Sequence, residues 1–141
     1  MPKTCTIDAS VFVNAFNPAE AGHADSFRVL ETLQTKATPI IVPTLLLAEV
    51  AAAIKRGRGD EGVARQFVAA LSQLSHLVWV TLDTGLAQEA ADIAAQYNLR
   101  GSDAVYVAVA YRFGADLITL DKEQHDRVKI LLNTWYPVDF E

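Results

Sequence analysis

Short apolar segments alternate with longer helical segments along this chain, and the alternation limits the folds that it can adopt. The apolar segments are rich in β-branched residues and have the length of buried strands. They span residues 4–7, 39–42, 77–81 and 117–120. Strands joined by helical crossovers form parallel sheets, and strands without polar alternation are covered on both faces. The sequence therefore predicts an α/β fold with a central parallel β-sheet flanked by helices on both faces.

The segments between these strands carry apolar residues at helical spacing. We expect helices over about 9–16, 23–36, 45–56, 63–74, 83–97, 103–113 and 122–127. Thr44, Asp60 and Ser102 stand just before three of these segments, and each is a residue type that caps helices. The apolar stretch 130–138 fits either one strand or a helix end followed by a strand.

The length of the chain suits one ordinary domain, which we place over residues 1–141. Hydrophobic residues make up 51% and charged residues 21%, a balance that excludes intrinsic disorder. Cys5 is the single cysteine, which excludes a disulfide framework and a multi-cysteine metal site. No apolar run reaches the roughly 18 residues of a membrane-spanning helix, and the N-terminus has no leader pattern. We expect a soluble, cytoplasmic protein without a membrane partner.

The chain has 17 acidic residues against 12 basic ones, a formal charge of −5. Such a balance argues against a protein that coats nucleic acid through its overall charge. It leaves open whether the acids are scattered over the surface or gathered in one site.

Two acids follow strands directly. Asp8 comes after the strand 4–7, and Asp121 comes after the strand 117–120. Ligands of open parallel sheets bind beyond the carboxyl ends of the strands, where both side chains would lie. Each acid is also a suitable helix cap, so its position alone does not decide between the two roles.

Two further acids belong to apolar helices. Glu49 is the only polar residue between Leu45 and Ile54, and a lone carboxylate in a buried helix is costly unless it is paired or metal-bound. The simpler interpretation is that Glu49 faces water or a lysine. Asp103 lies at the start of an apolar helix, where the helix dipole alone would favour an acid.

Four carboxylates that gather at one edge of a sheet repel one another unless cations lie between them. A site with oxygen ligands alone favours Mg²⁺ or Mn²⁺ over zinc or copper.

The motifs that carry these acids resemble those of PIN domains, most closely the VapC-type ribonuclease toxins of prokaryotic toxin–antitoxin pairs. The matching segments are 7–13, 47–50, 102–108 and 117–121. Successive acids are separated by 41, 54 and 18 positions, in the order and spacing of the family. The likeness extends over about residues 4–137, although each short motif is unspecific by itself.

The resemblance implies a metal-dependent endoribonuclease that hydrolyses RNA phosphodiester bonds. It implies one or two Mg²⁺ or Mn²⁺ ions held by a catalytic quartet, Asp8, Glu49, Asp103 and Asp121. Ser10 and Thr119 match supporting polar positions, and Asn14 is a further candidate. A VapB-type antitoxin is the implied inhibitor, and a homodimer the implied assembly. Either Asp103 or Asp121 would also orient the attacking water.

RNA needs cations away from the metal. The best local patch is formed by Lys55, Arg56 and Arg58, which follow the Glu49 segment. The same residues are favourable at the end of any helix, because they complement its dipole.

Other α/β enzymes fit the sequence less well. A dehalogenase-like phosphatase would carry a second acid where Ser10 stands. A receiver domain would carry an acidic pair before its phospho-acceptor strand, and a nucleotide-binding module would carry a glycine-rich loop after the first strand. The main alternative is a PIN-like domain that binds RNA or a protein without cutting.

Overall fold

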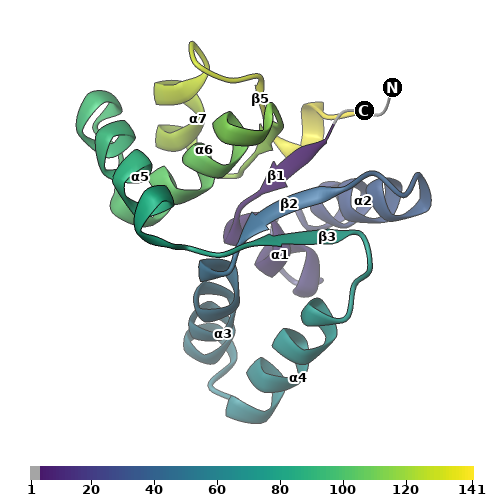
Figure 1. Cartoon of the computed structure of the whole chain (residues 1–141). Helices are drawn as coiled ribbons and strands as arrows, with labels where there is room; N and C mark the ends of the chain where they lie inside the picture. Colours follow the sequence, from purple (N-terminus) through teal and green to yellow (C-terminus); the bar gives the residue numbers. More distant parts are fainter. Residues whose placement is uncertain (1–3) are drawn as a thin grey trace.

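A computed structural model describes residues 4–141 of the chain, and its centre is a five-stranded parallel sheet (Figure 1). The strands are β1 (Cys5–Ile7), β2 (Ile40–Pro43), β3 (Leu77–Val80), β4 (Asp116–Ile118) and β5 (Thr134–Trp135). Their order across the sheet is β3-β2-β1-β4-β5, and every neighbouring pair is parallel. The α/β fold with a central parallel sheet, predicted from the alternation of apolar segments, is confirmed.

Helices connect the strands and cover the sheet. They are α1 (Ala9–Phe16), α2 (His23–Thr35), α3 (Leu45–Arg58), α4 (Glu61–Ser72), α5 (Thr84–Tyr97), α6 (Gly101–Phe113) and α7 (Lys122–Val128), followed by the 3₁₀ turn η1 (Pro137–Asp139). In Figure 1, α5, α6 and α7 lie together on one side of the strands, and α1 to α4 lie on the other. Helix α6 packs on β1, β2 and β4, and its residues 104–110 are all buried. This helix is the central element of the core, which explains its apolar composition.

The helix starts differ in part from the sequence expectation. Asp60 caps α4 through Val63 N, as expected. Thr44 stands before α3, but its hydroxyl accepts a hydrogen bond from Leu82 N and caps nothing. Helix α6 begins at Gly101, so Ser102 lies inside its first turn and does not cap it. In both cases a residue type that favours helix caps does not cap the helix.

The apolar stretch 130–138, left open by the sequence, contains the short strand β5 followed by η1. None of the helices within residues 4–141 combines the length and the apolar character needed to cross a membrane. The absence of a leader pattern was expected mainly from residues 1–3, which lie outside the described residues.

Candidate active site

The register of β1 and β4 brings the first predicted site residues together. Ile7 and Ile118 are direct partners in the sheet, so the next residues, Asp8 and Thr119, lie side by side at the carboxyl edge. Thr119 Oγ1 donates a hydrogen bond to Asp8 Oδ2 at 2.5 Å. The Asp8 side chain is buried, with 4% of the residue exposed. The pairing of β1 with β4 therefore places the Asp8 carboxylate at this edge of the sheet.

Two hydroxyl groups orient the Asp8 carboxylate. Ser10 Oγ donates to Asp8 Oδ1 at 2.5 Å, and it also accepts a hydrogen bond from Leu120 N. Thr119 Oγ1 likewise accepts from Asp121 N at 2.9 Å. Because the backbone N–H groups occupy lone pairs of both hydroxyls, the hydroxyl hydrogens point at Asp8. Ser10 and Thr119 thus both contact Asp8, and their supporting role in catalysis stays a prediction.

Ionisation of the Asp8 carboxyl group costs free energy because the group is buried. Burial raises its pKa to about 6, against the lowering effect of the Ser10 and Thr119 hydrogen bonds, and the charge of Asp103 raises the pKa further. At neutral pH the group is therefore ionised and buried, and no basic side chain among residues 4–141 forms an ion pair with it. A bound cation would relieve this cost.

Glu49 reaches the same site from α3. It is half-buried, and Tyr106 Oη donates a hydrogen bond to Glu49 Oε1 at 2.6 Å. Tyr106 comes from the buried helix α6, and burial together with this hydrogen bond raises its pKa, so it stays a donor. Helix α3 is buried only along Leu46, Val50 and Ile54, and Glu49 lies at the edge of that stripe.

Asp103 and Asp121 come from the first turn of α6 and from the residue before α7. Asp121 Oδ1 accepts a hydrogen bond from Gln124 N, so this acid also caps its helix. The other oxygen, Oδ2, accepts from Arg100 Nη2 at 2.5 Å. Arg100 Nε donates in turn to Asp103 Oδ2 at 3.2 Å. One guanidinium group therefore connects both carboxylates.

One pocket of about 190 Å³ is lined by all four predicted acids: Asp8, Glu49, Asp103 and Asp121. Burial raises the pKa of Asp103; Arg100 lowers it, and the charges of Asp121 and Glu49 raise it. The acids are thus close enough to repel one another, as their predicted convergence requires.

The donor chemistry of this pocket fits a hard divalent cation. Apart from Arg100, its polar lining side chains carry only oxygen donors, which Mg²⁺ and Mn²⁺ prefer. Within residues 4–141, no three acidic, histidine or cysteine side chains are grouped closely enough to hold an ion as they stand. Each of the four carboxylates has a hydrogen-bond partner from within the chain.

Other predicted residues lie outside the pocket. The side-chain amide of Asn14 donates to Glu20 Oε1 and to the carbonyl of Ala21, so Asn14 holds the loop after α1 and does not reach the acids. Lys55, Arg56 and Arg58 are exposed at the end of α3. They follow Glu49 by six to nine residues, which places them about 9–14 Å further along the same helix.

Three further residues contact the pocket acids and do not belong to the quartet predicted from the sequence: Tyr106, Arg100 and Gln124. Tyr106 reads as a core residue, although it follows Asp103 by three positions and so lies on the same face of the helix. Gln124, fully buried in α7, donates through Nε2 to the carbonyl of Asp103. Arg100 is one of the scattered basic residues of the chain, and its two ion pairs depend on the turn between α5 and α6.

Similarity to solved structures supports the fold. VapC20 of Mycobacterium tuberculosis, a sarcin–ricin loop cleaving toxin, matches with a TM-score of 0.74 and 17% identity over 91% of this chain and 95% of its own. PAE2754 from Pyrobaculum aerophilum matches with a TM-score of 0.69 and 20% identity over 98% of this chain and 86% of its own. A chain of the promoter-bound VapBC2 complex of Rickettsia felis matches with a TM-score of 0.69 and 15% identity over 94% of this chain and 98% of its own.

The sequence itself gives the family. No protein with a curated description matches this chain. The profile of the PIN domain matches residues 5–131, which include all four acids of the pocket. The chain therefore belongs to the PIN domain family.

Proposed function

We propose that this protein is a metal-dependent endoribonuclease and the toxin of a VapBC-type toxin–antitoxin pair. The observation that carries the proposal is the convergence of four carboxylates, from four separate segments of the chain, on one pocket at the carboxyl edge of the sheet. Membership of the PIN family and the similarity in fold to VapC20 support it. An RNA substrate makes the cytoplasm the expected compartment.

The roles of the side chains follow from their contacts. The four carboxylates would hold one or two Mg²⁺ or Mn²⁺ ions, which supply an activated water and stabilise charge on the phosphate. Ser10 and Thr119 fix the direction of Asp8, and Tyr106 fixes Glu49. Either Asp103 or Asp121 would in addition orient the attacking water.

The proposal is tested by an RNA cleavage assay on the purified protein, titrated with Mg²⁺ and separately with Mn²⁺. We expect cleavage that depends on the added ion. RNA binding without metal-dependent cleavage would instead favour a PIN domain that binds RNA or a protein without cutting.

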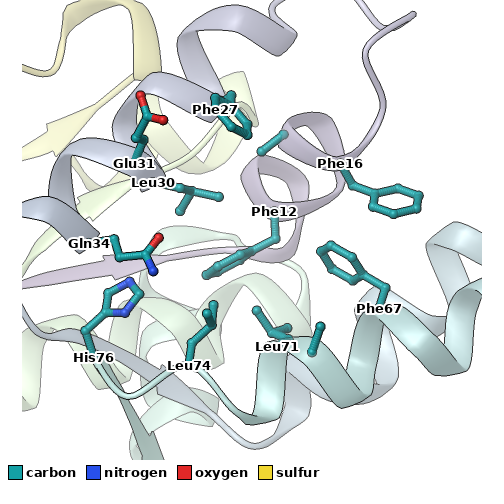
Figure 2. Close-up of a pocket in the computed structure, with 12 residues that line it drawn as sticks. Phe12, Phe16, Phe27, Leu30, Glu31, Gln34, Phe67, Leu71, Leu74 and His76 are labelled. Atoms are coloured by element: carbon teal, nitrogen blue, oxygen red, sulfur yellow. The ribbon is translucent and has the colours of Figure 1, made fainter.

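The second part of the proposal concerns an antitoxin partner. A pocket of about 260 Å³ lies between α1, α2 and α4 (Figure 2), and none of the side chains that line it belongs to the acidic site. The aromatic and aliphatic side chains that line it include Phe12, Phe16, Phe27, Leu30, Phe67 and Leu71. Several of the similar solved structures are toxin–antitoxin complexes, which supports a protein partner for this chain too. We assign the pocket to the apolar face of an antitoxin segment.

The implied homodimer stays a prediction.

A charge placed in this pocket should block the antitoxin without affecting the nuclease. Phe27 is 50% exposed, so Phe27→Glu is expected to fold normally and to weaken antitoxin binding at least about tenfold, because an apolar contact becomes a buried charge. Binding is measured with a purified VapB-type antitoxin. Ile130→Glu, at a residue 86% exposed and outside the pocket, is the control. Equal binding by both variants would contradict the assignment.

The basic residues at the end of α3 are proposed to bind RNA phosphates. Lys55, Arg56 and Arg58 are exposed; Lys55 Nζ donates to the carbonyl of Gly59, and the Arg58 guanidinium lies 6.0 Å from the centre of the Phe16 ring. Neither contact neutralises a charge, so the patch stays available to an anion.

Exchange of these three residues for Gln is expected to weaken RNA binding and to flatten its dependence on salt. Each phosphate contact with single-stranded RNA contributes about 0.7 to the logarithmic salt slope, so three lost contacts reduce it by about 2. Fluorescence anisotropy of a labelled RNA between low and high salt measures the slope. Lys36→Gln, at the end of α2, is the control for charge alone. An unchanged slope would contradict the proposed role.

A further inference from the structure

Arg100 lies across the acidic pocket and contributes the cationic side chain to the set of residues that line it. Its Nη2 is 2.5 Å from Asp121 Oδ2, and its Nε is 3.2 Å from Asp103 Oδ2. The side chain of Arg100 is 71% exposed, whereas those of Asp103 and Asp121 are 16% and 20% exposed. The guanidinium therefore reaches the carboxylates from the solvent side.

We propose that Arg100 is a phosphate-binding residue of the nuclease that Asp103 and Asp121 hold in place until a divalent cation displaces it. The inference rests on the proposed function, since it requires a metal ion at these acids and RNA as the substrate. It assigns one side chain two successive partners, first the carboxylates and then the phosphate.

Competition with the metal follows from the shared atoms. Arg100 bonds to an oxygen of each acid, and an ion coordinated by the same oxygens would place a second positive charge within contact distance of the guanidinium. Ion pairs this exposed to solvent are weak, so a divalent cation can break them at little cost. The closely grouped metal site that is absent from residues 4–141 would form as the guanidinium leaves.

Phosphate is the partner that suits the released side chain. A guanidinium stays charged at any physiological pH, and its planar fork of N–H donors matches phosphate oxygens in a bidentate way. Arg100 precedes the first residue of α6, and the amino end of that helix also favours an anion. The metal-binding acids and the guanidinium would then contact the same substrate group.

The first half of the test measures metal binding without RNA and without catalysis. Calorimetric titration with Mn²⁺ is expected to show tighter binding to Arg100→Gln than to the unmodified protein, between about two- and thirtyfold, because two exposed ion pairs no longer compete. Lys122→Gln removes the same charge beside Asp121 from an exposed side chain, and it controls for the general change in potential. Arg100→Lys keeps a positive charge but cannot make both contacts. Its affinity for Mn²⁺ should therefore lie between those of Arg100→Gln and the unmodified protein.

The second half measures RNA at saturating Mn²⁺. Arg100→Gln is expected to raise KM about tenfold, with a smaller change in kcat, because one charge-assisted contact to the substrate is lost. The exposure of Arg100 makes a folded variant the expectation, which circular dichroism and thermal unfolding verify.

Tighter Mn²⁺ binding together with a raised KM supports the inference. It is overturned if Arg100→Gln binds Mn²⁺ no more tightly than Lys122→Gln, or if KM is unchanged. Failure of the unmodified protein to bind Mn²⁺ at all would overturn the proposed function itself, and so the two failures are distinguishable.

Discussion

Asp8→Asn is expected to reduce RNA cleavage at least about a hundredfold and to leave a protein that is folded and, without metal, more stable than the original at neutral pH. Activity falls because an amide is a poor ligand for a divalent ion and carries no charge to balance it. The fold survives because the exchange keeps the shape of the side chain and a hydrogen-bond acceptor for one of its two hydroxyl partners.

The gain in stability follows from the pKa of Asp8, which burial raises from 3.8 to about 6. The folded state therefore binds this proton more tightly than the unfolded state does. The stabilisation from the protonated group is complete below about pH 3.8 and is lost as the pH rises through 6. At pH 7 the ionised carboxylate costs roughly 3 kcal/mol, and a neutral amide recovers about 1–3 kcal/mol of it.

Urea unfolding in the presence of EDTA at several pH values between 4 and 7.5 measures this difference. The two proteins should approach each other in stability near pH 4 and separate as the pH rises. Asp126→Asn is a matched control, because Asp126 is an exposed acid that pairs with His125 outside the pocket. It should retain full cleavage and show no gain in stability. An Asp8→Asn variant that cuts RNA as fast as the original would refute its proposed role.

The sheet and the convergence of the four acids could be predicted because the carboxyl ends of parallel strands lie at one edge of the sheet. The apolar strands 4–7 and 117–120 locate Asp8 and Asp121 to within a few residues of the observed edge. The parallel direction of the strands follows from general rules for helical crossovers, whereas the pairing of β1 with β4 was not predicted. Glu49 was conspicuous as the one polar residue in an apolar run, and its hydrogen bond to Tyr106 explains how a half-buried helix tolerates it.

The partners of those acids could not be predicted, because they depend on the turn geometry between elements. Asn14 was expected near the site, but its amide satisfies the loop at Glu20 and Ala21 instead. Arg100 reaches Asp121, 21 positions away, only because the end of α5 turns directly into α6. Neither outcome is visible in a pattern of spacing along one helix or strand.

The location of the acids changes the meaning of the net charge. Removing the four pocket acids from the 17 acidic residues leaves 13, against 12 basic residues. Most of the −5 is therefore concentrated at the carboxyl edge of the sheet. A pocket with that charge repels phosphate until cations neutralise it, so the low net charge is compatible with a nuclease that requires metal.

Removal of divalent metal is accordingly expected to abolish cleavage, by at least about a thousandfold, and readdition of Mg²⁺ or Mn²⁺ to restore it. The same ions should stabilise the RNA-free protein by about 2.7 kcal/mol at one hundred times the dissociation constant, measured by thermal unfolding.

The stabilisation should be larger at pH 7 than at pH 5, because protons compete with the ion for Asp8, whose pKa is about 6 without metal. Asp8→Asn provides the control, since it removes both a ligand and the titrating group, and it should lose most of the metal-induced stabilisation at either pH. Cleavage that persists in EDTA would contradict metal dependence. An ion that stabilises the protein without restoring cleavage would identify a metal-binding PIN domain that does not cut RNA.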